Sequence, residues 1–93
     1  MQLHRYVVEF IGTFAIMTVI LLHGNYLAIG AIVGLAVMFG GAISGGAFNP
    51  AVAIAMMFSG LIPSADLMPY IVAEIAGAVV AIDAVKLFTD SNI

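Results

Sequence analysis

The charged residues of this chain are confined to residues 1–9 and 66–93. No Asp, Glu, Lys or Arg occurs in residues 10–65, which make up more than half of the 93-residue sequence. Of all residues, 65% are hydrophobic and 8% are charged, which lies outside the range of an ordinary soluble domain. Water cannot be the main solvent of such a stretch. The sequence therefore predicts a single all-α domain that is integral to a membrane and crosses it more than once.

Residues 44–59 begin with the sequence SGGAFNPAVAIA, in which a glycine-rich turn leads into a short apolar helix. Asn49 suits a helix N-cap, and Pro50 suits the first helical position, where a missing N–H group has no consequence. Gly60 and Pro63 end the helix after about eleven residues, or about 16 Å. Because a hydrocarbon core is about 30 Å thick, the sequence predicts a re-entrant loop and half-helix.

Irregular backbone at membrane depth is tolerated only where it is buried in protein or lines a wet cavity. One interpretation of the half-helix is therefore a buried turn. The other is that the positive end of its dipole points at the midplane, which is how channels and transporters meet their solutes. We favour the second interpretation.

Three long apolar segments surround the half-helix and are predicted to be transmembrane helices. They cover about residues 6–23, 27–43 and 67–88. Ser64 and Asp66 are both suitable caps for the third segment. The chain as a whole is predicted to form one domain, residues 1–93.

Small residues lie on one face of the second and third segments. Gly30, Gly34 and Gly41 allow close helix contact and predict that the second segment packs inside the protein. Gly77 and Ala81 belong to a similar ridge on the third segment.

Two carboxylates lie within predicted spans, and a carboxylate there is costly enough to need a reason. Glu9 could accept hydrogen bonds from backbone N–H groups of the re-entrant loop, or it could relay protons or cations. No Lys or Arg lies nearby to pair with it, and the scaffold role is the favoured interpretation. The same choice applies to Glu74.

The composition excludes several classes of function. The chain has no cysteine, so disulfides, thiol catalysis and a cysteine-based metal site are excluded. The net charge of −3 is scattered and leaves no basic patch for nucleic acid. No nucleophile, base and orienting group occur together, so we expect neither an enzyme nor a cofactor or metal.

Three blocks of the sequence resemble the first half of an aquaporin or aquaglyceroporin, members of the major intrinsic protein family. They are EFIGTF at residues 9–14, ISGGAFNPAV at residues 43–52 and AEIAGA at residues 73–78. The blocks occur in the family's order and extend over nearly the whole chain. The resemblance implies one half of a six-span fold, in which two inverted repeats each contribute a half-helix.

The resemblance also implies roles for individual residues. The side-chain amide of Asn49 would donate to the passing solute oxygen, and the dipoles of two half-helices would orient single-file water and repel cations. Glu9 and Glu74 would hold the loop, although the family usually has Gln at the position of Glu74. We call residues 44–51 the pore turn; they are Ser44, Gly45, Gly46, Ala47, Phe48, Asn49, Pro50 and Ala51.

The family's narrow filter uses a bulky aromatic from the second span, a residue from the fifth span and an arginine after the second Asn-Pro-Ala motif. In an ungapped alignment, Ile29 takes the place of the aromatic. If the same sequence also forms the second repeat of the six-span fold, the remaining filter positions correspond to Val37, Gly46 and Val52. None of these is polar or cationic, so we expect weak discrimination between water and small neutral solutes such as glycerol.

A single repeat leaves Asn49 and its polar backbone without a partner in the membrane. Two copies of opposite orientation, related by a two-fold axis in the membrane plane, would rebuild the six-span fold. If the family's tetramer also persists, the assembly would contain eight chains in contact with lipid. Two rival interpretations remain: a small dual-topology proton-coupled transporter that uses Glu9, and a non-conducting partner subunit of a full-length aquaporin.

The charges at the two ends predict how the chain inserts. Arg5 flanks the first span and Lys86 the third, so the positive-inside rule gives almost no preferred orientation. Cysteines introduced next to Arg5 and Lys86 should each be labelled from both sides of the membrane at comparable levels. Labelling of each position from one side alone would contradict the antiparallel pair.

Overall fold

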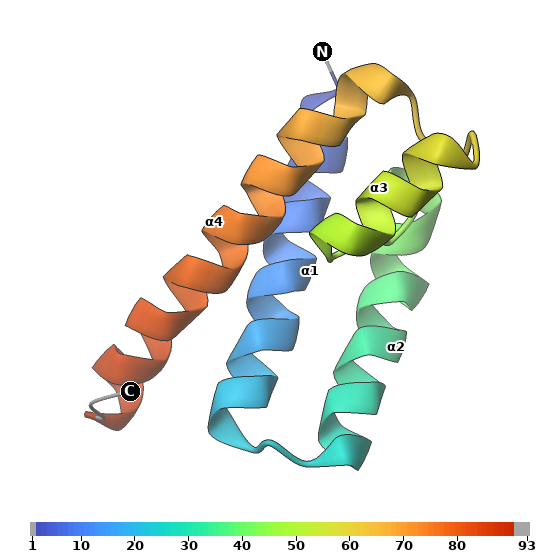
Figure 1. Ribbon diagram of the computed structural model, residues 1–93. Helices are drawn as coiled ribbons and strands as arrows, with labels where there is room; N and C mark the ends of the chain where they lie inside the picture. Colours follow the sequence, from blue (N-terminus) through green and yellow to red (C-terminus); the bar gives the residue numbers. More distant parts are fainter. Residues whose placement is uncertain (1, 91–93) are drawn as a thin grey trace.

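The computed structural model describes residues 2–90, which are helical apart from three short connections. The helices are α1 (Leu3–Leu22), α2 (Tyr26–Ser44), α3 (Pro50–Phe58) and α4 (Ser64–Thr89). Helices α1 and α4 run in the same direction and pack against each other, and α2 runs back alongside α1 (Figure 1). The short helix α3 packs on α4 and occupies only the half of the molecule where α1 and α4 begin (Figure 1).

Two of the long helices extend beyond the predicted spans. Helix α1 begins at Leu3, three residues before the predicted start at about residue 6, and α4 begins three residues before residue 67. The hydropathy pattern locates only the apolar part of each helix. Polar residues at the ends continue the helix without contributing to that pattern.

The predicted caps of the third span are wrong. The N-cap of α4 is Pro63, which makes no side-chain cap hydrogen bond, and Ser64 is already helical. Asp66 lies in the first turn, where its carboxylate accepts hydrogen bonds from Arg5 and Tyr6 of α1 instead of capping α4. A tertiary ion pair has replaced the local interaction.

The contact between α1 and α4 is close enough to bring backbone against backbone. A Cβ atom added to Gly77 would lie 2.5 Å from the carbonyl oxygen of Phe10 and 3.2 Å from the amide nitrogen of Phe14. Only glycine allows this approach at the crossing point. The buried face of α4 repeats every three or four residues and comprises Asp66, Tyr70, Glu74, Gly77, Ala81 and Val85.

The small-residue face of α2 is open, contrary to the prediction that this helix packs inside the protein. An added Cβ on Gly30 or Gly34 would meet no atom within 4 Å. Of the α2 residues, Gly40 and Ser44 alone are buried, because α2 packs along α1 and meets α4 only at its C-terminal end. The face therefore remains available to another helix.

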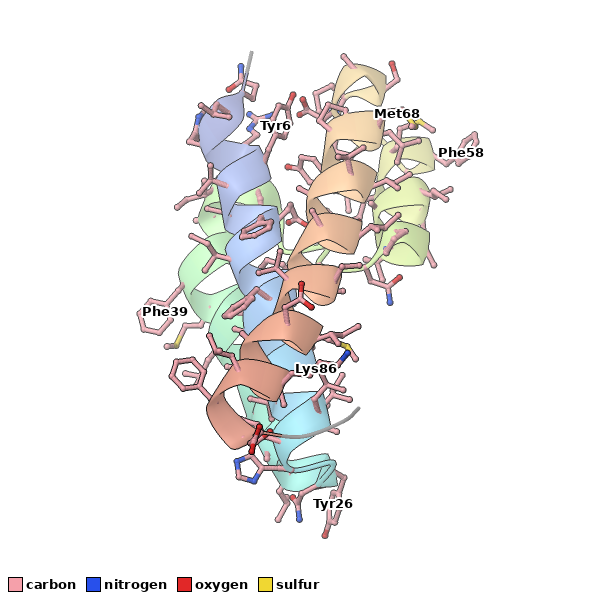
Figure 2. All side chains as sticks on the ribbon, turned by 90° about the vertical axis from the view of Figure 1, so that its left-hand side faces the viewer. Tyr6, Tyr26, Phe39, Phe58, Met68 and Lys86 are labelled. Carbon is pink, nitrogen blue, oxygen red and sulfur yellow. The ribbon has the colours of Figure 1, made fainter. Side chains whose placement is uncertain are left out.

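The molecule has polar side chains inside and large apolar side chains outside. Its largest fully buried side chains are Tyr70, Glu9 and Glu74. In contrast, Phe39 is 74% exposed and Phe58 is 80% exposed, and both point away from the helices (Figure 2). Exposed apolar surface of this extent is unfavourable in water, whereas lipid provides an apolar solvent for it.

Two of the described helices, α1 and α2, are long and apolar enough to cross a membrane. Helix α4 has 26 residues, or about 39 Å at the usual helical rise, which is ample length for a span. The longest dimension of the molecule is 41 Å, similar to a bilayer of about 40–45 Å with its headgroups. The assignment of a third span to α4 stays a prediction.

The backbone contact at Gly77 predicts a strong difference between two glycine substitutions. Gly77→Ala should destabilise the protein by about 1–3 kcal/mol, because its methyl group would push α4 away from α1. Gly30→Ala is the matched control for the single chain, since its methyl group meets no atom of the same chain within 4 Å and alanine favours the helix by about 1 kcal/mol. Thermal unfolding in detergent measures both. Equal stability of the two variants would contradict the close contact.

Candidate functional site

The pore turn connects α2 to α3 through an unusual backbone. Gly45 ends α2 with φ at +91°, and Gly46 follows with φ at +72°. Glycine adopts this left-handed region without a steric penalty, which explains the Gly-Gly pair. Phe48 also has a positive φ, at +52°, which is unfavourable for a residue with a bulky side chain. Tertiary contacts must therefore hold Phe48 in place.

The ring of Phe48 is fixed between α1 and α2. A Cβ atom added to Gly12 of α1 would clash with the ring, and one added to Gly40 of α2 would lie 3.2 Å from its Cζ. Two glycines thus create the space that the ring fills. The packing of Phe48 holds the strained residue and ties the turn to both helices.

Glu9 of α1 is the polar support of the pore turn. Its side chain is 0% exposed, and its Oε1 accepts a hydrogen bond of 2.7 Å from the backbone N–H of Phe48. Its Oε2 accepts hydrogen bonds from the Ser44 hydroxyl at 2.6 Å and from the Ala47 N–H at 3.3 Å. Hydrogen bonds to an ionised acceptor are stronger than those between neutral groups. Here they satisfy buried N–H groups that have no helical acceptor, because the turn lies outside the helices.

Ser44 links this support to α4. Its hydroxyl accepts a hydrogen bond of 3.2 Å from the Gly46 N–H, and its carbonyl oxygen accepts one of 2.6 Å from the hydroxyl of Tyr70. Tyr70 is fully buried on α4. The start of the pore turn is therefore held from both α1 and α4.

Asn49 is the N-cap of α3, and it stands at the surface of the chain. Its Oδ1 accepts a hydrogen bond of 2.8 Å from the Ala51 N–H, and Pro50 occupies the first helical position. The amide group of its side chain makes no hydrogen bond within residues 2–90. Asn49, Ala51 and Val52 are exposed, and α3 begins near the middle of the molecule's length (Figure 1). An unpaired donor thus stands at the positive end of a helix dipole.

Glu74 lies beside the pore turn without a hydrogen bond to it. The Glu9 side chain and the Asn49 backbone are its polar neighbours. It is 1% exposed, and neither of its carboxyl oxygens has a hydrogen-bond partner within the described residues. The loop-supporting role that the resemblance implies for Glu74 stays a prediction, because no hydrogen bond joins Glu74 to the turn within the described residues.

Of the four filter-like residues, Val37 and Gly46 lie together within a single chain, and Ile29 lies apart from Val37. A Cβ atom added to Gly46 would lie 3.4 Å from Cγ2 of Val37, so these two residues are neighbours. Val52 lies exposed in the first turn of α3. Ile29 precedes Val37 by eight residues on α2, which places it about 12 Å farther along the helix.

A polar cluster where α1 and α4 begin was not recognised in the sequence. Arg5 and Asp66 form an ion pair with a distance of 3.0 Å, and the Tyr6 hydroxyl donates a hydrogen bond of 2.7 Å to Asp66. The available signal was the four-residue spacing of Asp66, Tyr70 and Glu74, which places these polar residues on one helix face.

This cluster borders a cavity of about 670 Å³ next to the pore turn. Polar side chains, glycines and apolar side chains together line this cavity. Its lining includes Arg5, Ser44, Gly45, Gly60, Pro63 and Tyr70.

Residues 21–93 match the family model described as Major intrinsic protein, which covers the pore turn, α2, α3 and α4. The chain belongs to the major intrinsic protein family. A glycerol uptake facilitator protein-like 6 from Lactiplantibacillus plantarum is 46% identical over 99 aligned positions, which cover 96% of this chain and 45% of the relative. The match thus extends over Glu9 and most of α1 in addition to the family-model region.

Two further relatives carry aquaporin names. Aquaporin Z from Brucella melitensis is 51% identical over 41 positions, which cover 44% of this chain and 18% of the relative. Aquaporin-10 from Milnesium tardigradum is 46% identical over 63 positions, covering 63% of this chain and 15% of the relative. The chain therefore spans less than half the length of these relatives. No solved structure matches it.

The hydrogen bonds of Glu9 predict different outcomes for two substitutions. Glu9→Gln keeps an acceptor for the Phe48 N–H, and its NH2 group can donate to the Ser44 hydroxyl, so the fold should survive with a modest loss. Glu9→Leu leaves these buried groups unsatisfied at about 1–3 kcal/mol each and should abolish a folded turn.

Thermal unfolding in detergent and water permeability of proteoliposomes measure this difference. Equal losses in the two variants would contradict the acceptor role of Glu9 and favour a role that requires its ionisable group.

Proposed function

We propose that this chain forms half of a membrane channel for water and small neutral solutes such as glycerol. The observation that carries the proposal is the free amide of Asn49 at the start of a half-length helix. Membership of the major intrinsic protein family and the printed names of its relatives, a glycerol uptake facilitator-like protein and aquaporins, support this choice of solutes.

The proposed mechanism uses the geometry of the pore turn. The Asn49 amide donates a hydrogen bond to the oxygen atom of a passing water or alcohol. The dipole of α3 has its positive end at the same place, so it repels cations and orients each solute with its oxygen toward Asn49. Glu9 and the Phe48 ring hold the backbone of the turn in place. Asn49 is therefore already positioned before a solute arrives.

The proposed location is a membrane that α1, α2 and α4 each cross. The buried carboxylates and exposed phenylalanines support this location, because such a distribution suits an apolar solvent. Helix α3 then reaches from the middle of the bilayer to one surface.

We further propose that a second copy in the opposite orientation completes the pore, and that four such pairs assemble as eight chains. The open face at Gly30 and Gly34 and the exposed start of α3 support this pairing, because each lacks a packing partner within the described chain. The pairing also accounts for the separation of Ile29 from the other filter-like residues. One copy would contribute Ile29, and the other would contribute Val37, Gly46 and Val52 at the same constriction.

The hydrogen bonds of Glu9 favour the channel over a proton-coupled transporter. Its carboxylate accepts hydrogen bonds from three donors, which belong to Ser44, Ala47 and Phe48. A carboxylate that cycled between protonation states would lose part of this support in each cycle. Passive conduction requires no such change.

Paired measurements of water and glycerol permeability in proteoliposomes test the proposal. The wild-type chain should conduct both solutes and exclude ions. Val52→Arg would place a cation at each mouth of a symmetric pair, and should lower glycerol flux about tenfold more than water flux, because it narrows an apolar constriction.

Asp90→Asn, at the far end of α4, is the matched control and should leave the flux ratio unchanged. Liposomes that remain impermeable to water and glycerol with wild-type protein would overturn the channel and favour a non-conducting partner subunit. An unchanged ratio in a conducting Val52→Arg variant would show that Val52 does not line the constriction.

A further inference from the structure

Glu74 is a buried carboxyl group that the proposed conduction mechanism does not use. It is 1% exposed, and both of its oxygens lack hydrogen-bond partners within residues 2–90. Burying a bare carboxylate in such a place costs far more free energy than burying a neutral carboxylic acid. A neutral acid also has a hydroxyl donor that a carboxylate lacks.

Glu9 has room to accept that donor. An ionised carboxylate offers about four acceptor positions, two on each oxygen. Ser44 and Ala47 occupy both positions on Oε2, but the Phe48 N–H is the only donor to Oε1 within the described residues. The open position therefore belongs to a carboxylate that neighbours Glu74.

The pore turn also contains one N–H group without an acceptor. The N–H groups of Gly46, Ala47 and Phe48 are all bonded, and Pro50 has none. The backbone N–H of Asn49 has no acceptor within residues 2–90, and it lies beside Glu74. A neutral Glu74 can serve both groups, because its hydroxyl donates and its carbonyl oxygen accepts.

We propose that Glu9 and Glu74 form a site that holds one buried proton, with the Glu74 hydroxyl donating to Oε1 of Glu9 and the Glu74 carbonyl accepting from the Asn49 N–H. The pair then carries a single negative charge, and every N–H of the pore turn from Gly46 to Asn49 has an acceptor. Glu74 is thus a positioning residue for Asn49.

Loss of this proton would disrupt the turn. The two carboxylates would repel each other, and the donor to Oε1 would vanish. The elements packed against α4 offer no compensating cation: α1 presents Glu9, α3 contains no titratable side chain, and Arg5 is already paired with Asp66 one turn of α4 beyond Tyr70. Folding of the turn is therefore favoured at lower pH and is lost as the pH rises and Glu74 ionises.

Infrared spectroscopy of the detergent-solubilised protein tests the proton site directly. The wild type at neutral pH should show the C=O stretching band of a protonated carboxylic acid, and the band should disappear at alkaline pH. It should be absent from Glu74→Gln and present in the control Asp90→Asn. A wild type without the band, or a Glu74→Gln variant that retains it, would overturn the proposal.

The consequence for conduction rests on the proposed function and needs a second measurement. Between about pH 6 and about pH 10, wild-type water permeability should fall by about tenfold or more as Glu74 ionises. Glu74→Gln should conduct with a flat pH profile, because its amide oxygen accepts from Asn49 and its NH2 group donates to Glu9 without ionising.

Parallel pH profiles in wild type and Glu74→Gln would overturn the control of conduction by this proton. If no variant conducts, the channel proposal fails, while the infrared band still decides whether Glu74 holds the proton.

Discussion

The interaction on which the rest of the structure depends is the set of hydrogen bonds that Glu9 accepts from the pore turn. The turn interrupts the helices with a left-handed backbone, so its N–H groups have no helical acceptors. A carboxylate buried on α1 satisfies two of them together with the Ser44 hydroxyl. Without it, the chain would bury unsatisfied polar backbone at the position least able to tolerate it.

The close contact of α1 with α4 makes this support specific. Because Gly77 allows the two backbones to touch, the preceding turns of α4 bring Tyr70 and Glu74 to the pore turn. Tyr70 holds the start of the turn through Ser44, and Glu74 lies next to its end at Asn49. The burial of Glu9, Ser44 and Tyr70 is tolerated because each of them is hydrogen-bonded.

The hydrogen bonds and packing that hold the pore turn determine which of its polar groups is exposed. With Glu9 and the Phe48 ring fixing the backbone, the Asn49 amide stands free at the start of α3. The exposed surfaces beside it, on α2 and at the beginning of α3, lack partners in the described chain. The rigid presentation of a donor and the open packing surface around it are the two properties from which the proposed channel follows.

The sequence by itself determined the helical class, the two long apolar helices and the short helix after Asn49-Pro50. These follow from local chemistry: an uncharged stretch, a capping residue and helix-ending glycine and proline. The cost of a carboxylate in an apolar span pointed to Glu9 and Glu74, and the glycine and capping pattern pointed to the pore turn. The resemblance named the family, and the comparison with known proteins confirmed it. Helix ends were less predictable, because polar residues extend α1 and α4 beyond their apolar parts.

Tertiary structure decided what no local pattern encodes. In the folded chain, Asp66 is a hydrogen-bond partner of Arg5 and Tyr6 instead of a helix cap. Gly30 and Gly34 of α2 remain open, whereas Gly77 is buried against the backbone of α1. Both outcomes depend on which helix lies opposite, and composition and spacing do not specify that. The same reason separates the two carboxylates: Glu9 and Glu74 look alike in the sequence, but only Glu9 faces the N–H groups of Ala47 and Phe48.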